Sequence, residues 1–165
     1  MTWLLGEKDT NANGFPEGSG MMEIHGLDSE MIDVAAYSQK ALEDAAKIAA
    51  VLEDDEQARS YEQKAAELKV KINERFWVDD FNSYGDFIAN DSQTLQLIED
   101  AIVRADTLRK PWAVEELEQT KGYLLKHPSK KERPFVLHHN WVVNTPMEVG
   151  IAPEDRAQKA LETAR

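Results

Sequence analysis

Small and apolar residues recur at helical spacing through the first half of the chain. One stripe begins at Met31 and is broken by the acidic run of residues 53–55, and a second begins at Ala58 and ends at Phe76. Steps of three and four residues are typical of amphipathic helices with one buried face. The loop between the stripes is short, which predicts an antiparallel helical hairpin. The first stripe comprises Met31, Val34, Ala35, Ser38, Ala41, Leu42, Ala45, Ile48, Ala49 and Leu52.

Punctuating residues mark the ends of the expected helices. Asp28 and Ser29 are good N-cap candidates for the first helix, and Asp91 or Ser92 for a third helix that extends to Ala105. A fourth helix is expected from Pro111, because proline in a first turn lacks only an N–H that would be unpaired there. A last helix is expected from Pro153.

The remaining segments do not show this periodicity. Residues 1–28 are expected to form a loop, because residues 11–20 combine asparagine, glycine, proline and serine, which disfavour regular helix. Residues 77–90 are also expected to be irregular, and residues 135–143 form either a short strand or an extended entry into a helix. No alternating pattern predicts a strand ladder, so the fold class is all-α, built of antiparallel helical hairpins.

Composition narrows the classes of function. The 165 residues fit one domain, residues 1–165, and their net charge of −12 disfavours nucleic acid and anionic membranes as partners. No apolar run approaches the roughly 20 residues of a spanning helix. The first five residues lack the length and basic start of a signal peptide, so a cytoplasmic location is expected. The absence of cysteine excludes disulfides and thiolate chemistry.

Alternating oxygen side chains open a candidate calcium loop. Asp9, Asn11 and Asn13 are followed by Gly14, as in the first half of an EF-hand loop. The glutamate expected at the twelfth position is replaced by Gly20. An Asx turn without a metal is therefore favoured over calcium, and no cofactor is expected.

Carboxylates cluster around the start of the first helix. Glu17 and Glu23 lie in a glycine-rich loop. One carboxylic acid with a raised pKa can protonate a leaving oxygen while a second carboxylate activates water. The alternative is that both glutamates are simply solvated. Glu30 and Asp33 lie three residues apart, so they share a helix face. A favourable interaction with the helix dipole is enough to explain Glu30. It is a less sufficient explanation for Asp33, because Asp33 lies close to the apolar stripe.

A tryptophan among polar side chains is typical of carbohydrate sites. Trp141 follows His138-His139-Asn140 and precedes Glu148, and an indole face packs well on the C–H face of a pyranose. A buried core position is the alternative for this tryptophan. Adjacent histidines point in different directions, so they make a poor metal site.

Residues 14–37 resemble the central region of six-hairpin glycosidases. The stretch Phe15-Pro-Glu-Gly-Ser-Gly-Met-Met-Glu-Ile-His-Gly-Leu-Asp28 carries most of the likeness, followed by Phe76-Trp77, Ser83-Tyr84-Gly-Asp86 and Trp141-Val-Val-Asn-Thr-Pro-Met-Glu148. These are the (α/α)6-barrel enzymes, in particular bacterial relatives of glucoamylase and of the amylo-α-1,6-glucosidase part of glycogen debranching enzymes.

The resemblance implies specific roles. It implies inverting acid/base hydrolysis of α-glucosidic linkages in an oligosaccharide, with Glu17 as the first match to the acid and Glu23 as the second. Phe15, Asp33, Trp141 and Glu148 match positions around the substrate cleft. No match to the base is evident.

The same resemblance implies part of an (α/α)6 toroid. Such a barrel has twelve helices, and the pattern predicts five or six here, so we expect a glycoside hydrolase only where the full domain is present. Inner helix faces would then be covered by the remainder of the barrel or by self-association. The alternative function is a tetratricopeptide-like scaffold that binds peptides, suggested by the alanine-rich hairpin with Tyr61 and Ala65 at repeat-like positions.

Overall fold

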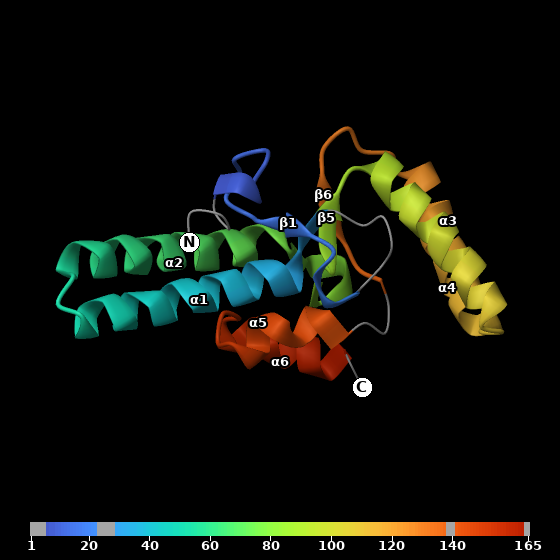
Figure 1. The fold of residues 1–165 in the computed structure, drawn as a ribbon. Coiled ribbons are helices and arrows are strands. Elements are labelled where there is room, and N and C mark those ends of the chain that lie inside the picture. Colours follow the sequence, from blue (N-terminus) through green and yellow to red (C-terminus); the bar gives the residue numbers. More distant parts are fainter. Residues whose placement is uncertain (1–5, 23–28, 138–140, 164–165) are drawn as a thin grey trace.

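Helices dominate the computed structural model, which describes residues 6–22, 29–137 and 141–163. Two long antiparallel hairpins extend to opposite sides of a small sheet, and two short helices lie beneath the first hairpin (Figure 1). The expected fold of helical hairpins is confirmed. The hairpins do not stack on each other as they would in a superhelical scaffold.

The helices occupy most of the expected segments. They are α1 (Ile32–Val51), α2 (Asp55–Arg75), α3 (Asp91–Thr107), α4 (Pro111–Lys126), α5 (Thr145–Glu148) and α6 (Glu154–Thr163). Short 3-10 helices span η2 (Gly20–Met22), η3 (Asp79–Phe81) and η4 (Trp141–Asn144). The strands are β1 (Glu17–Gly18), β2 (Ser29–Met31), β3 (Trp77–Val78), β4 (Ser83–Tyr84), β5 (Phe87–Ala89) and β6 (Arg133–Phe135).

The two hairpin turns share one backbone geometry. After α1, the N–H of Glu53 donates to the carbonyl of Ala50 and that of Asp54 to Ala49. After α3, the N–H of Arg109 likewise donates to the carbonyl of Asp106 and that of Lys110 to the carbonyl of Ala105. These paired bonds form a Schellman motif, which favours a left-handed residue usually supplied by glycine. Here Glu53 (φ 59°) and Arg109 (φ 55°) take that conformation.

The N-termini of the later helices are capped by side chains. Asp54 accepts from the N–H of Gln57 at the start of α2. Asn90 and Gln93 form a reciprocal capping box at α3, one residue before the expected cap. Pro111 begins α4 as expected.

A four-stranded antiparallel sheet, in the order β1-β2-β5-β6, joins the hairpins. Glu17 pairs with Glu30, Glu30 with Ile88, and Ile88 with Pro134. The expectation of no strand ladder was wrong, because the strands have two or three residues and cannot display an alternation. In β5 all three residues are buried, so no alternation exists to detect.

The start of α1 also differs from the prediction. Ser29 and Glu30 lie in β2 rather than at a helix cap, and Met31 precedes the first helical residue without a side-chain cap. Asp28 lies outside the described residues. The backbone of Ile32 donates instead to the carbonyl of Asp86 at 3.0 Å, so the sheet supplies the cap.

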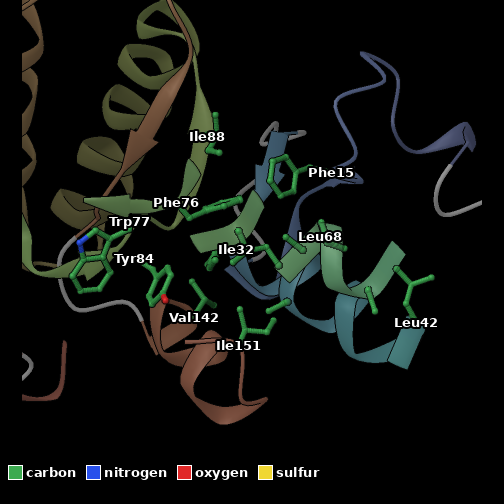
Figure 2. Packing of buried hydrophobic residues seen from close by; sticks show 14 of the residues in the cluster. Phe15, Ile32, Leu42, Leu68, Phe76, Trp77, Tyr84, Ile88, Val142 and Ile151 are labelled. Atoms are coloured by element: carbon green, nitrogen blue, oxygen red, sulfur yellow. The ribbon is translucent and has the colours of Figure 1, made fainter. Parts of the chain in front are cut away.

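The main core lies between the first hairpin, β3–β5 and the C-terminal helices (Figure 2). Phe15 is only 1% exposed, and its ring meets that of Phe76 edge-on at 5.3 Å between centroids. Phe15 is therefore part of the core, and its expected role at a substrate cleft stays a prediction. At the far end of α1, Ile48 and Leu52 of the predicted buried stripe are exposed, since α2 covers only the face that carries Leu42 and Ala49.

Polar contacts attach the C-terminal helices to α2. The Tyr84 hydroxyl donates to Asn73 Oδ1 at 2.5 Å, and Arg156 donates to the Asn73 carbonyl. The Arg156 guanidinium also lies 5.0 Å from the centre of the Trp77 ring. Burial raises the pKa of Tyr84 to about 12, so its hydroxyl remains a donor at any physiological pH. Among the described helices, none combines the length and apolarity needed to cross a bilayer.

We predict that Phe15→Ala lowers the free energy of unfolding by about 3–5 kcal/mol, because it leaves a cavity against Phe76. Trp141→Ala, at a side chain that is more than half exposed, is the matched control and should cost less than about 1 kcal/mol. Urea unfolding followed by circular dichroism measures both changes. Equal losses in the two variants would contradict the core role of Phe15.

Candidate functional site

Asp33 lies in the first turn of α1 with its carboxylate buried, at 1% exposure. The backbone N–H of Met21 donates to Oδ2 at 2.5 Å. The other oxygen, Oδ1, is buried and has no hydrogen-bond partner among the described residues. A buried acceptor without a donor costs about 1–3 kcal/mol, so a donor from a ligand would be favourable here.

Gly20 brings the glycine-rich loop against this carboxylate. Its φ of +55° lies in the left-handed region, and an added Cβ would meet Asp33 Oδ1 at 2.5 Å. A side chain at position 20 would therefore collide with the same oxygen that has no partner. The glycine permits the close approach of η2 to α1.

An open hollow of about 350 Å³ adjoins Asp33. Its walls come from η2 and from one face of α1, and they are largely apolar apart from the carboxylate. A small, mostly apolar concavity with a few placed polar groups is the usual form of a small-molecule site. The lining residues are Gly20, Met21, Asp33, Val34, Tyr37, Ser38 and Ala41.

Tyr37 connects this hollow with the C-terminal segment. Its hydroxyl donates to Glu148 Oε2 at 3.3 Å, and α5, which ends at Glu148, packs against α1. Desolvation and then the charge of Glu148 raise the pKa of Tyr37, with Asp33 contributing in the same direction. The sequence-predicted residues Asp33 and Glu148 are thus brought to the same end of α1.

Trp141 begins η4, which also packs against α1. Its indole is more than half exposed, so the alternative of a buried core tryptophan is wrong. An exposed indole at this end of the molecule is available to a ligand. Val142, the next residue, is fully buried and anchors the segment in the core.

Of Glu17 and Glu23, the pair predicted for catalysis, the structure describes only Glu17. Both carboxylate oxygens of Glu17 accept from Thr10, one from its N–H at 2.9 Å and one from its hydroxyl at 2.8 Å. Glu23 lies outside the described residues, as do His138, His139 and Asn140. The role of either glutamate stays a prediction.

Glu30 is a buried carboxyl that the sequence analysis assigned to the helix dipole. It lies in β2 at 3% exposure, and its Oε1 accepts from the side-chain amides of Asn11, at 3.0 Å, and Asn13. Desolvation raises the pKa of Glu30, and the two amides oppose this shift. Glu30 is buried because the segment Ser29–Met31 is an extended strand rather than a helix turn, and the sequence pattern did not indicate this.

The candidate calcium loop uses its polar groups internally. Asp9 accepts from the backbone N–H groups of Asn13 and Gly14, at 2.9 and 2.8 Å. The amides of Asn11 and Asn13 donate to Glu30, as above. Within the described ranges no three His, Cys, Asp or Glu side chains are grouped to hold a metal. The expectation of no cofactor, with calcium at Asp9, Asn11 and Asn13 as the disfavoured alternative, stays a prediction.

Comparison with known families identifies the fold to which these hairpins belong. Residues 24–121, which are 98 of the 165, match the model of the bacterial alpha-L-rhamnosidase 6 hairpin glycosidase domain. The chain belongs to this family. The expected six-hairpin glycosidase superfamily is thereby confirmed, within its rhamnosidase branch. No curated protein and no solved structure matches the chain.

The match to the six-hairpin glycosidase domain covers the first hairpin, the strands from β2 to β5, α3, and α4 as far as Lys121. Glu30, Asp33 and Tyr37 lie inside the matched residues, whereas Glu17 and Glu23 lie before them. The segment with Trp141 and Glu148 lies after them. The hollow beside Asp33 is therefore built mainly from the part of the chain that defines the family.

We predict that Glu30 makes stability fall as pH rises. The folded protein retains this proton to a higher pH than the unfolded chain, whose glutamate titrates near 4.5. The contribution is therefore full below the unfolded pKa and is lost as pH rises through the raised pKa of the folded state. Glu30→Gln should flatten this part of the stability profile.

Urea unfolding between about pH 4 and pH 8 measures the slope. Glu74→Gln, at an exposed position of α2, is the matched control and should leave the slope unchanged. An unaltered slope in Glu30→Gln would contradict the assignment.

Proposed function

We propose that this chain forms part of the catalytic domain of a glycoside hydrolase, and that the hollow beside Asp33 binds a sugar ring. The carrying observation is the buried Oδ1 of Asp33, which lacks a donor among the described residues and belongs to a side chain that lines a hollow of about 350 Å³. Sugar hydroxyls are donors of the kind this oxygen requires. The family membership supports the reaction class.

The substrate class follows from the family and from the resemblance. The family model bears the name of an alpha-L-rhamnosidase, so a terminal α-L-rhamnoside is the first candidate. An α-glucosidic linkage is the second, because residues 14–37 resemble the glucoamylase-like branch. The methyl group of rhamnose at C6 suits the apolar walls that Val34 and Ala41 contribute to the hollow.

The chemistry proposed is inverting hydrolysis. One carboxylic acid protonates the leaving oxygen while a second carboxylate activates water on the opposite face of the sugar. Glu17 and Glu23 are the candidates for the acid. Asp33 holds the sugar through its hydroxyls, and Tyr37, Glu148 and Trp141 extend the binding surface.

The described residues contain six α-helices, of which α5 has only four residues, whereas a closed barrel of this class has twelve. We therefore propose that other helices complete the cleft and supply the base. The acid and the base must come from opposite sides of the sugar, so one hairpin surface alone is insufficient for turnover. This chain by itself is expected to bind sugar without hydrolysing it.

We predict that Asp33→Asn weakens sugar binding at least about tenfold, because the amide turns a donor toward the sugar hydroxyl where an acceptor stood. Isothermal titration with methyl α-L-rhamnopyranoside and with methyl α-D-glucopyranoside measures the affinity and ranks the two substrate classes. Asp44→Asn, at an exposed position of the same helix, is the matched control. Absence of binding by the unaltered chain, or equal affinity in both variants, would contradict the proposed site.

The acid is tested in a completed barrel that carries this segment. Glu17→Gln or Glu23→Gln, whichever removes the acid, should lower kcat on a rhamno-oligosaccharide by about 10²–10⁴. The loss should be much smaller on 4-nitrophenyl α-L-rhamnoside, whose leaving group needs no proton. Glu67→Gln on the surface of α2 is the control. Full activity on both substrates in both variants would exclude these glutamates, and proton NMR of the first-formed anomer tests inversion.

A further inference from the structure

The ends of the two long hairpins carry exposed apolar side chains beside charges of opposite sign. We define the acidic tip as the turn between α1 and α2, residues 48–56, and the basic tip as the turn between α3 and α4, residues 103–112. Each tip exposes three large apolar side chains, and all six are more than half exposed. They are Ile48, Val51 and Leu52 on the acidic tip and Val103, Leu108 and Trp112 on the basic tip.

The charges on the two tips are complementary. The acidic tip has the four carboxylates of residues 53–56 and no basic residue. The basic tip has Arg104, Arg109 and Lys110 against the single carboxylate of Asp106. All of these charged residues are exposed, and none of them forms a salt bridge with another described residue. Each tip therefore combines exposed apolar side chains with charged ones, and protein interfaces use both kinds of side chain.

The geometry of the molecule prevents the tips from meeting within one copy. The hairpins point to opposite sides of the sheet, so the tips lie at opposite ends of the molecule (Figure 1). A contact between them must join two copies. A heterologous contact of this kind repeats head to tail, because a pair of copies still has one unused acidic tip and one unused basic tip.

We propose that the acidic tip of one copy of this chain docks on the basic tip of another. The net charge of −12 opposes association of copies in general, and the basic tip supplies the local positive charge that this contact needs. Two hairpin ends bury little surface, so the interface belongs to the small, transient class. Its dissociation constant should be on the order of 0.1 mM at low salt, and it should weaken as salt screens the charges.

Sedimentation velocity of the full chain from about 10 µM to about 1 mM tests the proposal. The weight-average sedimentation coefficient should rise with concentration at about 50 mM salt and fall back toward the monomer value at about 500 mM. A monomer throughout the low-salt series would overturn the proposal.

Charge reversal of each tip makes the test specific. Glu53→Lys with Glu56→Lys leaves the acidic tip without net charge, and Arg104→Glu with Arg109→Glu gives a chain with two acidic tips. Each double variant alone should associate at least about tenfold more weakly than the unaltered chain. An equimolar mixture of the two should associate again, because the unaltered basic tip of the first variant then meets an acidic tip of the second.

Glu74→Lys with Asp80→Lys is the matched control for Glu53→Lys with Glu56→Lys, since it makes the same change in net charge at exposed positions away from both tips. It should leave the association within about threefold of the unaltered chain, as expected for charges beyond the Debye length. Association that persists in both tip variants, or a mixture that stays monomeric, would overturn the proposed contact. Circular dichroism of each variant establishes that the helices are retained.

Discussion

The pairing of β2 with β5 fixes where the first hairpin begins. These strands are only three residues long, yet their ladder continues directly into the bond from Ile32 to the carbonyl of Asp86, at 3.0 Å. The N–H of Asp86 in turn donates to Phe135 at 2.7 Å, which ties in β6. The first turn of α1, and with it Asp33, is thus held directly by the backbone of Asp86 and, through Asp86, by β6. The hollow beside Asp33 depends on this sheet more than on the helices that dominate the fold.

The helices could be predicted from the sequence because each repeats its signal over several turns. The hairpin of α1 and α2 followed from the spacing of small and apolar residues, and Pro111 marked the start of α4. The sheet escaped prediction because two or three residues contain too little pattern to separate a strand from a loop. Ile48 and Leu52 continued the apolar stripe, but α2 leaves that face uncovered, and only tertiary packing decides such coverage.

In the candidate site, too, some features could be predicted from the sequence and others could not. Asp33 stood out because a carboxylate so close to an apolar stripe is unusual, and the structure places it beside a hollow. The proximity of Glu148 to Tyr37 joins residues separated by 111 positions, which no local pattern encodes. Phe15 had a sequence neighbourhood typical of a cleft, yet the edge of its ring fits against Phe76 in the core. Glu30 was interpreted through the helix dipole, and its burial followed only from the strand that replaces the expected helix turn.

The two left-handed residues of the hairpin turns, Glu53 and Arg109, combine a strained backbone conformation with an exposed charge. Glu53 and Arg109 adopt a conformation that costs a residue with a Cβ about 1–2 kcal/mol, and glycine would relieve this cost. Replacing both with glycine would relax each turn, while one negative and one positive charge would leave opposite ends of the molecule. The melting temperature would then rise, whereas the electrostatic attraction between the two ends of neighbouring copies would weaken. Greater thermal stability would thus come with a lower tendency to associate.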